Sequence, residues 1–325
     1  MKITLSYGGG GEETNRLIND LFYKYFNNEI LTKAEDAAIV KTNEEIAFTT
    51  DSFTISPIFF NGGDIGKLSV VGTCNDLAMM GAKPEYLTCG FIIEEGLEFN
   101  VLEKIVKSMS DELKKVGAKI VAGDTKVVPA GSVDKVFINT SGIGKVIRKG
   151  ISASNLKVGD KIIVSRDIGR HGTVVMAHRY GVETDLKSDC KLLWEEVKAL
   201  IDEKINIKAM RDATRGGLSA VLNEWAKSSR VGIEIEEEKV PISDEVIGLC
   251  EIFGFEPMDL ANEGTFIVAV EDSDAKRAEE ILKKFNENAS IIGEVTQDNR
   301  VVLKNPWGSK RVIELPKGEL LPRIC

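Results

Sequence analysis

Stretches with the apolar spacing of strands alternate along this chain with stretches spaced like helices, and this alternation requires a fold that mixes helices with sheets. In the first half, a helical pattern has apolar residues at 65, 68, 71, 77 and 80 and ends at Gly81 and Pro84. A second helical pattern, over 101–116, ends at Gly117. Strands are predicted around these helices, with the sequences IAFTTDS, YLTCGFII, KIVAGD and KVFINTSGIGKV.

A second unit of the same mixed kind begins near residue 150. Strands are predicted at LKVGDKIIVSRDIG, VGIEIEE, GTFIVAV and SIIGEVT, and helices at about 171–180, 192–203, 217–228, 244–253 and 274–285. Because a domain commonly holds about 150 residues, a chain of 325 residues accommodates two. We therefore predict an α+β protein with mixed domains at 1–149 and 150–313. A flexible tail is predicted at 314–325, where Pro316 and Pro322 disfavour regular structure.

Charge and hydropathy argue against several classes of partner. The net charge is −9 and no basic stripe is present, which disfavours nucleic acid. No run of about 18 apolar residues offers a membrane span, and the first residues lack the apolar segment of a signal peptide. The sequence therefore predicts a cytoplasmic protein that binds neither nucleic acid nor a membrane.

The thiols and imidazoles do not form a recognisable metal motif. The five cysteines are odd in number and widely spaced: Cys74, Cys89, Cys190, Cys250 and Cys325. We interpret the first four as small buried hydrophobic residues in a reducing compartment. Only two histidines are present, so an imidazole-based zinc or iron site is disfavoured. Cys325 stands apart because it is the last residue, and a thiol at a free end can move between sites.

Two glycine-rich stretches bear on phosphate binding. NGGDIGKL approaches a Walker A loop, but Asn61 replaces its first glycine and Leu68 its Ser/Thr, so we reject that interpretation. The run Gly8–Gly11 allows backbone N–H groups to converge on an anion. A simple flexible loop explains these glycines equally well, and both interpretations stay open.

A set of aspartates stands beside glycines or at the ends of predicted strands: Asp51, Asp64, Asp76, Asp124 and Asp212. Each one alone is better explained as a turn or cap residue. Together they suggest oxygen ligands that converge on one place. Carboxylates without imidazole or thiolate suit Mg²⁺, which commonly bridges protein carboxylates to nucleotide phosphates. The sequence therefore predicts a site for Mg²⁺ and a nucleotide.

Longer motifs closely resemble the HypE family of hydrogenase maturation proteins: TTDSFTISPIFFNGGDIGKLSVVGTCNDLAMMGAKPEYL, FIIEEG, GDTKVV, RDATRGGL, ANEG and the terminal PRIC. That family is part of an ATP-using superfamily with aminoimidazole ribonucleotide synthetase, selenophosphate synthetase and thiamine-phosphate kinase. The resemblance covers essentially the whole chain and implies two domains of the aminoimidazole ribonucleotide synthetase-like type. The aspartate motifs are shared across the superfamily, whereas PRIC is specific to the HypE branch. The chain departs from the family pattern at Tyr7, where His is usual, and at Ala213, where Pro is common.

The resemblance also implies an activity and its partners. In this family the terminal cysteine receives a carbamoyl group from the carbamoyltransferase HypF. ATP then drives dehydration of this group to a thiocyanate, and the cyanide passes to iron on the HypC–HypD scaffold for [NiFe]-hydrogenase. A homodimer is implied as well, in which the N-terminal sheets of two copies form a joint barrel.

Roles for individual residues follow from the same resemblance. Cys325 is the expected carrier, Glu263 is the expected base, and Lys126 is a second candidate for the base. Expected Mg²⁺ ligands are Asp51, Asp76, Asp124 and Asp212. Expected ATP contacts are Gly9, Gly10, Asp51, Asp64, Lys67, Asn75, Asp76, Gly123, Asp124, Thr125, Arg215 and Gly216. Arg215, Gly216 and Gly217 are also predicted to open a helix, whose N-terminus favours anions.

Structural explanations stay open beside these roles: a passive thiol for Cys325, a loop cap for Glu263 and solvated side chains for Lys67 and Lys126. Two other functions stay open too. One is a small-molecule kinase or synthetase of the same superfamily that uses the aspartates but not the tail. The other is a non-enzymatic scaffold whose terminal thiol binds metal, which leaves the aspartates unexplained.

Overall fold

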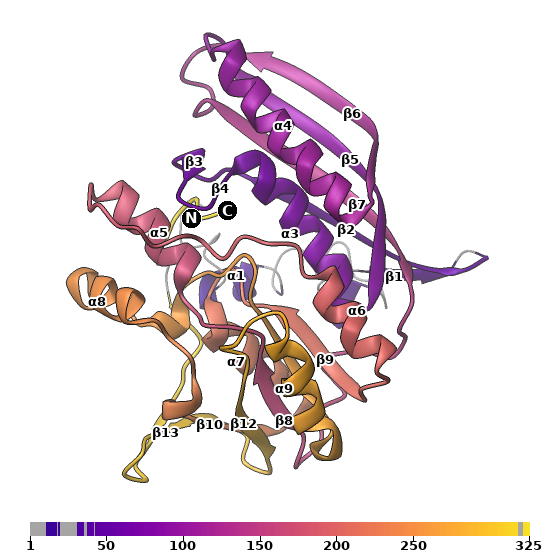
Figure 1. Cartoon of the computed structure of the whole chain (residues 1–325), viewed down its shortest axis with the longest axis vertical. Helices are drawn as coiled ribbons and strands as arrows, with labels where there is room; N and C mark the ends of the chain where they lie inside the picture. Colours follow the sequence, from indigo (N-terminus) through magenta and orange to yellow (C-terminus); the bar gives the residue numbers. More distant parts are fainter. Residues whose placement is uncertain (1–10, 18, 20–30, 36–37, 42, 318–320) are drawn as a thin grey trace.

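The computed structural model of this chain describes residues 11–17, 19, 31–35, 38–41, 43–317 and 321–325. Two large β-sheets dominate the described residues, and the helix α3 (Ile65–Met79) lies between them (Figure 1). The predicted α+β class and the mixed character of both halves are confirmed.

The first sheet belongs to the N-terminal half. Its strand order is β1-β2-β7-β5-β6, with β5 and β6 parallel and the other neighbours antiparallel. The strands are β1 (Ala38–Lys41), β2 (Glu45–Phe53), β5 (Ala82–Glu94), β6 (Lys119–Val128) and β7 (Val136–Val146). A small hairpin of β3 (Phe59–Phe60) and β4 (Gly63–Asp64) precedes α3. Helix α4 (Phe99–Val116) packs on α3 and ends at Gly117, as predicted.

The two faces of this sheet have different surroundings. On β7, every second residue from Val136 to Val146 is buried on the inner face, beneath α3. The outer face carries large apolar side chains that remain exposed, among them Phe48 at 45%, Tyr86 at 47% and Ile92 at 43%. In the edge strand β6, all residues but the last are exposed.

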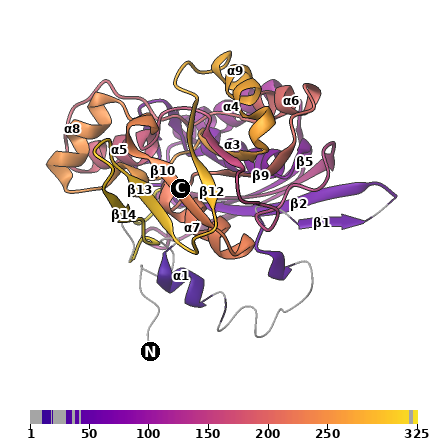
Figure 2. The ribbon, with the colours of Figure 1, turned by 90° about the horizontal axis from the view of Figure 1, so that it is seen from below.

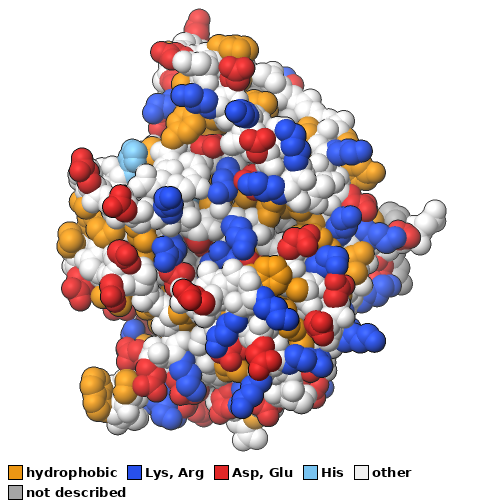
Figure 3. All heavy atoms as spheres, viewed as in Figure 1, with side chains coloured by type: hydrophobic (Ala, Val, Ile, Leu, Met, Phe, Trp, Pro, Cys, Tyr) orange, Lys and Arg blue, Asp and Glu red, His pale blue; other side chains and the backbone are white. Residues whose placement is uncertain are grey.

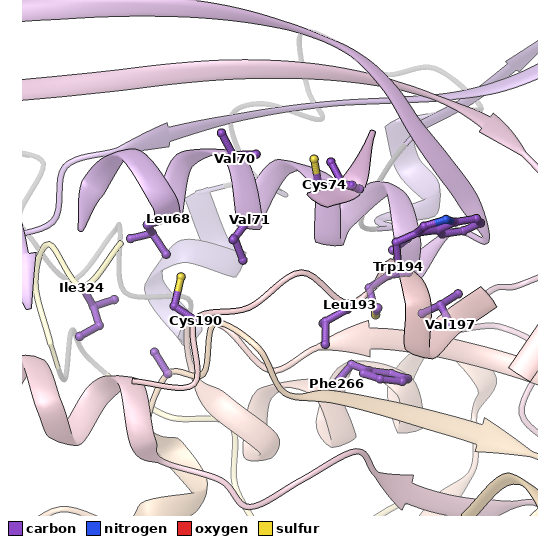
Figure 4. Packing of buried hydrophobic residues seen from close by; sticks show 14 of the residues in the cluster. Leu68, Val70, Val71, Cys74, Cys190, Leu193, Trp194, Val197, Phe266 and Ile324 are labelled. Atoms are coloured by element: carbon purple, nitrogen blue, oxygen red, sulfur yellow. The ribbon is translucent and has the colours of Figure 1, made fainter. Parts of the chain in front are cut away.

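Helix α3 is buried on all sides, and this explains its nearly continuous run of small and apolar residues. Thirteen of its 15 residues are buried. It approaches the sheet closely because a Cβ at Gly72 would lie 2.9 Å from the Phe53 ring, and one at Gly142 would lie 2.7 Å from Thr73. Side chains on its opposite side face the C-terminal half: Figure 4 shows Leu68 and Val71 directed toward Cys190 and Leu193.

The second sheet belongs to the C-terminal half and has the strand order β14-β13-β10-β12-β8-β11-β9. The strands are β8 (Lys161–Val164), β9 (Ile207–Asp212), β10 (Gly232–Glu236), β11 (Phe266–Val270), β12 (Ser290–Thr296), β13 (Val301–Lys304) and β14 (Lys310–Val312). The helices are α5 (Arg170–Arg179), α6 (Trp194–Asp202), α7 (Gly217–Ser229), α8 (Asp244–Phe253) and α9 (Ala275–Lys283). Helix α7 packs on one face of the sheet, in a core with Ile233 and Ile267, while α5, α6 and α9 join the core on the other face.

The predicted helices and most predicted strands are confirmed within a few residues. Strands β1 and β13 and the hairpin β3–β4 were not predicted, because strands of four residues or fewer carry a weak periodic signal. In Figure 2 the helix α1 (Glu12–Leu17) lies at the periphery, where it borders a pocket of about 790 Å³ together with α7. No helix in the described part of the chain is long and apolar enough to cross a membrane.

Candidate functional site

Residues 321–325 of the tail run into the body of the protein. Ile324 is only 3% exposed and joins the main hydrophobic core beside Cys190 (Figure 4). The segment after β2 holds the tail by its backbone: the Thr54 N–H donates to the Cys325 carbonyl (2.9 Å) and the Ser56 N–H to the Arg323 carbonyl (3.3 Å). This part of the tail is therefore docked. The predicted mobility of residues 314–325 stays a prediction.

Arg323 adds side-chain anchors to the docked tail. Its Nε donates to the Thr54 carbonyl (2.8 Å), and its Nη1 forms an ion pair with Asp134 (3.0 Å). The guanidinium also lies over the Phe137 ring at 5.5 Å from its centre, a cation–π contact. The structure thus pairs the positive charge of Arg323 with a carboxylate.

The thiol of Cys325 lies among charged groups from both domains. Its pKa is raised to about 12, chiefly by burial, which Arg215 opposes and to which the nearby carboxylates of Glu263, Asp51 and Asp212 add. A docked Cys325 is therefore a neutral thiol at physiological pH and a weak nucleophile. The same position presents any group carried on its sulfur to these four side chains.

Glu263 is the most deeply buried acid of the site. It is 2% exposed, and its Oε1 atom has no hydrogen-bond partner among the described residues. Burial raises its pKa well above the ordinary value, with further increases from Asp212, Asp189 and Asp51, against a decrease from Arg215. A carboxylate with an unpartnered Oε1 and a raised pKa is, when ionised, a stronger base than an exposed glutamate, which suits general base chemistry.

The loop that carries Glu263 is held by Asp189. Oδ1 of Asp189 accepts from the Glu263 N–H (3.2 Å), and its Oδ2 accepts from the Gly264 N–H (2.9 Å) and the Thr265 hydroxyl (2.8 Å). A Cβ at position 264 would lie 1.9 Å from the Asp189 carbonyl oxygen, so only glycine fits there. The motif ANEG thus fixes the position of the Glu263 carboxyl, because the buried carboxylate of Asp189 stabilises the loop that carries it.

Asp51 and Asp212 approach one another from the two domains. Asp51 lies on the inner face of β2 and accepts from the Thr73 hydroxyl of α3 (2.8 Å), while Asp212 ends β9. Burial raises the pKa of Asp212 to about 7, with Asp51 adding to the rise against Arg211. Burial also raises the pKa of Asp51, which Thr73 and Arg215 oppose. Two carboxylates that repel one another favour a bound cation between them.

Asp76 lies one turn beyond Thr73 on α3 and accepts from the Thr49 hydroxyl at 2.7 Å. Thr49 lies on the same face of β2 as Asp51. The neighbour of Asp76, Asn75, makes hydrogen bonds to the second domain, and its predicted contact with ATP stays a prediction. The Asn75 amide donates to the Lys191 (3.0 Å) and Glu263 (3.4 Å) carbonyls and accepts from the Leu193 N–H (2.9 Å). Both its amide hydrogens therefore tie α3 to the second domain.

Asp64 and Lys67 lie at the start of α3. Asp64 caps the helix: its Oδ1 accepts from the N–H groups of Gly66 (2.7 Å) and Lys67 (3.0 Å) and from the Ser108 hydroxyl (2.6 Å). These bonds make Asp64 the N-cap of α3, and its predicted contact with ATP stays a prediction. Lys67 donates to the Gly62 carbonyl (2.9 Å) and borders a pocket of about 310 Å³.

The predicted residues of the GDTK motif all lie on the exposed edge strand β6. The cross-strand register aligns Asp51 with Thr140, Cys89 and Gly123, so Asp51 and the motif are three strands apart, or ~14 Å at about 4.8 Å per strand. Asp124 aligns instead with Gly90 and Asn139 on the outer face. It pairs there with Lys126 at 2.7 Å, and the lysine holds the pKa of Asp124 low.

The expected four-aspartate ligand set is therefore not assembled within one chain. Among the described residues, no three His, Cys, Asp or Glu side chains are grouped as a metal site. Arg215 and Gly216 precede α7 as predicted, with Gly216 at a φ of 78°. Tyr7, Gly9 and Gly10 lie outside the described residues. Sequence reasoning missed Asp189, Thr54 and His171, because nothing in their local pattern separates them from ordinary polar residues.

Comparisons with known proteins agree with the two-domain fold. The family pattern of AIR synthase related proteins matches in both halves, the N-terminal domain over residues 34–146 and the C-terminal domain over 157–304. The carbamoyl dehydratase HypE of Escherichia coli is 43% identical over 336 residues, which cover 99% of each protein. A chain of the crystal structure of a HypE–HypF complex has a TM-score of 0.88 at 47% identity, over 92% of this chain and 99% of that one. HypE crystallised in complex with ATP has a TM-score of 0.84 at 41% identity, over 100% of both chains.

Proposed function

Because the chain belongs to the HypE family of hydrogenase maturation proteins, we propose that it is an ATP-dependent carbamoyl dehydratase whose substrate is an S-carbamoyl group on its own Cys325. One observation carries this proposal: the partly buried Cys325 thiol lies close enough to Glu263, whose Oε1 has no hydrogen-bond partner among the described residues, for that acid to raise its pKa. A passive terminal thiol has no need of such a position. Both domains are of the predicted aminoimidazole ribonucleotide synthetase-like type.

The chemistry balances in two steps without an oxidant. In the first step, the carbamoyl oxygen attacks the γ-phosphorus of ATP, ADP leaves, and the nitrogen loses one proton. In the second step, the nitrogen loses its remaining proton, the C–O bond breaks, and phosphate departs with its electron pair, which leaves S–C≡N on the sulfur. Phosphorylation is needed because an amide oxygen is otherwise a poor leaving group.

Glu263 is our choice for the base in these proton losses. Its raised pKa makes the carboxylate a better base than an exposed glutamate, and the loop held by Asp189 fixes it beside the sulfur. Arg215 lies close enough to lower the pKa of Cys325, so its charge also offsets negative charge that develops on a transferred phosphoryl oxygen. Lys126 remains the second candidate for the base.

Mg²⁺ fits the donor set of the inner face. Asp51 and Asp212 would hold it, with Asp76 close by on α3, because their mutual repulsion is relieved by a cation. When bound, Mg²⁺ supplies charge neutralisation for the phosphates of ATP. ATP binding itself is supported by the related HypE structure that contains the nucleotide.

We extend the proposal to a homodimer formed through the first sheet. Among the described residues, no strand pairs with the outer edge of β6, and its apolar side chains Val121 and Val127 are 59% and 66% exposed. Exposed edges and apolar faces of this kind are normally covered in soluble proteins. A second copy placed there would also bring its own Asp124 and Lys126 toward a site that this chain leaves without them. A sedimentation experiment that finds a fully active monomer at micromolar concentration contradicts the dimer.

The proposed partners are HypF, as donor of the carbamoyl group, and a HypC–HypD scaffold, as acceptor of the cyanide. The related HypE–HypF complex supports the first. Residues 314–325, when extended, reach at most ~40 Å at about 3.3–3.6 Å per residue, enough to carry Cys325 from its docked position to a partner. Acidic and basic side chains are interspersed on the face shown in Figure 3, without a continuous basic stripe for nucleic acid. All five cysteines are free thiols, which fits the expected reducing cytoplasm.

The deciding experiment is intact mass spectrometry of the full-length protein after incubation with the carbamoyltransferase, carbamoyl phosphate and ATP. We expect Cys325 to gain one carbamoyl group and then to lose the mass of one water, with equal amounts of ADP and phosphate formed in that second stage. The Cys325→Ala chain should show neither change. Phosphorylation of a free small molecule, with no mass change on the tail, would instead favour the kinase alternative.

A further inference from the structure

Helix α5 contacts the docked tail through its first and last turns. Nε2 of His171 lies 2.9 Å from the carbonyl oxygen of Ile324, and Nη2 of Arg179 lies 2.5 Å from that of Arg323. Nε of Arg179 also donates to the Ser56 carbonyl (2.6 Å), within the segment that binds the other side of the tail. The tail is thus held between α5 and residues 54–56.

The hydrogen bond to Ile324 defines the protonation of His171. A carbonyl oxygen can only accept, so Nε2 must carry the hydrogen. The ring is fully buried against Phe60, edge to face at 5.2 Å, and burial lowers its pKa, so the imidazole is neutral. Nδ1 must therefore accept from the hydroxyl of Ser188, which lies at 2.8 Å.

Ser188 connects this histidine to the loop of the base. Its hydroxyl oxygen accepts from the Cys190 N–H at 3.1 Å, and the residue between them is Asp189, which holds the N–H groups of Glu263 and Gly264. One segment, 188–190, therefore orients both the imidazole that contacts the tail and the loop that carries Glu263. The tail carbonyl and the base are placed by the same short stretch of chain.

We propose that His171, oriented by Ser188, and Arg179 are positioning residues that hold the tail by its backbone so that the group on Cys325 meets Glu263. This inference rests on the proposed function, because it assigns the contacts to one stage of that reaction. The two side chains bind the carbonyls of Arg323 and Ile324 and no atom of the Cys325 side chain. The same contacts can therefore form with a free thiol, a thiocarbamate or a thiocyanate.

The contacts also favour the docked tail over a released one. When the tail leaves for a partner, the Nε2–H of a buried imidazole loses its acceptor, which is unfavourable unless water replaces it. Release is thus opposed by α5, and a partner must supply compensating contacts. A purely structural histidine would stabilise the fold without any effect on the position of Cys325.

The test uses the full-length protein and measures how fast N-ethylmaleimide modifies Cys325, followed by peptide mass spectrometry. The variants are His171→Leu, which removes the donor, His171→Gln, which retains one, and Arg179→Met. The matched control is His178→Leu, an exposed histidine on the same helix. The buried Cys74, Cys89, Cys190 and Cys250 report in every sample on whether the fold is intact.

We expect Cys325 to react about three- to tenfold faster in His171→Leu and Arg179→Met, the range for loss of one hydrogen bond. His171→Gln should lie close to the unaltered protein, and His178→Leu should match it. Single-turnover conversion of the carbamoylated tail should fall by a similar factor in the first two variants, with KM for ATP unchanged. If His171→Leu exposes the buried cysteines, Arg179→Met, whose altered side chain is only half-buried, decides the matter.

Unchanged Cys325 reactivity in both variants overturns the positioning role, whatever the enzyme does. The labelling needs no catalysis, so the two proposals fail separately. If the variants label faster but the unaltered protein never converts its carbamoyl group, the proposed function fails and the tail contacts stand.

Discussion

The inner and outer faces of the first sheet carry residues from the same set of sequence motifs, yet their surroundings differ in nearly every respect. On the inner face, Asp51 is packed under α3, opposed by Asp212 and close to Cys325. On the outer face, Asp124 and Lys126 form an exposed ion pair on an uncovered strand. Desolvation raises the pKa values of the carboxyls at the inner face, such as Asp212, whereas on the outer face Lys126 lowers the pKa of Asp124.

The difference shows that a motif can predict the chemical role of a residue. It does not predict whether the residue acts in a site of its own chain or in a site of a second copy. A surface pair such as Asp124–Lys126 contributes little to stability. Its place on an apolar strand that the described residues leave exposed is understandable if a second copy covers the pair and uses it. The inner face would then be half of a site, and the outer face the other half of a neighbouring one.

The largest expected effect separates the two candidates for the base. Glu263→Gln should lower the rate of conversion of the carbamoyl group by about 10²–10⁴, because the amide cannot take a proton. Carbamoylation of Cys325 should persist in this variant, since the thiol is modified away from Glu263. Mass spectrometry of the tail over time checks both stages, with Lys126→Met as the counterpart on the outer face. A greater loss of conversion in Lys126→Met would move the base to β6.

The next effect tests whether the two faces work across copies. Asp51→Asn and Asp124→Asn should each remove most ATP turnover, on the order of 10²-fold, because Mg²⁺ and phosphate lose a charged partner. Denatured and refolded mixtures of the two should regain about one quarter of full activity, since half the dimers are mixed and each holds one intact site of two. Turnover by mixtures that stays at the level of the single variants would place both aspartates in one chain.

A smaller effect concerns how pH acts on the docked tail. Docking raises the pKa of the Cys325 thiol from 9.0 to about 12, so the docked tail keeps its proton where the released tail loses it. The stabilisation of docking is therefore complete below pH 9 and is lost as the pH rises toward 12, by about tenfold per pH unit. Removal of the tail by carboxypeptidase should accelerate between pH 8 and pH 10, and Cys325→Ser should abolish that acceleration. An equal pH response in the serine variant would refute the thiol as its source.

The smallest effect concerns Asp64, which belongs to a motif predicted to bind ATP and which caps the N-terminus of α3 in the structure. Asp64→Ala should destabilise the protein by about 1 kcal/mol, because the first turn of α3 loses its acceptor. Asp64→Asn keeps an acceptor, so its thermal unfolding and its ATP turnover should both stay near those of the unaltered protein. A selective loss of turnover in Asp64→Asn would support the predicted contact with ATP.

Periodicity and turn residues predicted most of this fold, because they report on local structure. Gly117 ends α4 and Gly216 precedes α7 as the sequence indicated. Register and face were not predictable: whether Asp124 faces inward depends on how β5 and β6 align, including the irregularity at Leu87 and Thr88. Short strands such as β13 were missed because hydrogen bonds to a distant neighbour define them, and no local pattern does.

The candidate site, like the fold, was only partly predictable from the sequence. An acid, a thiol and several carboxylates were predicted from residue types alone, because the chemistry of each side chain is known from its type. The docked position of Cys325 was not foreseeable, since it depends on backbone donors at Thr54 and Ser56 and on the distant helix α5. Backbone donors carry no sequence signature, so only the folded structure shows where the tail lies.

The burial of α3 on both sides has a consequence for how the molecule comes apart. One side of this helix packs under the first sheet and the other against the C-terminal half, to which Asn75 adds three hydrogen bonds. A fragment cut near residue 150 would expose Leu68 and Val71, which fill the contact between the halves. The two halves should therefore melt as one cooperative unit, with a single calorimetric transition, although each has a sheet of its own.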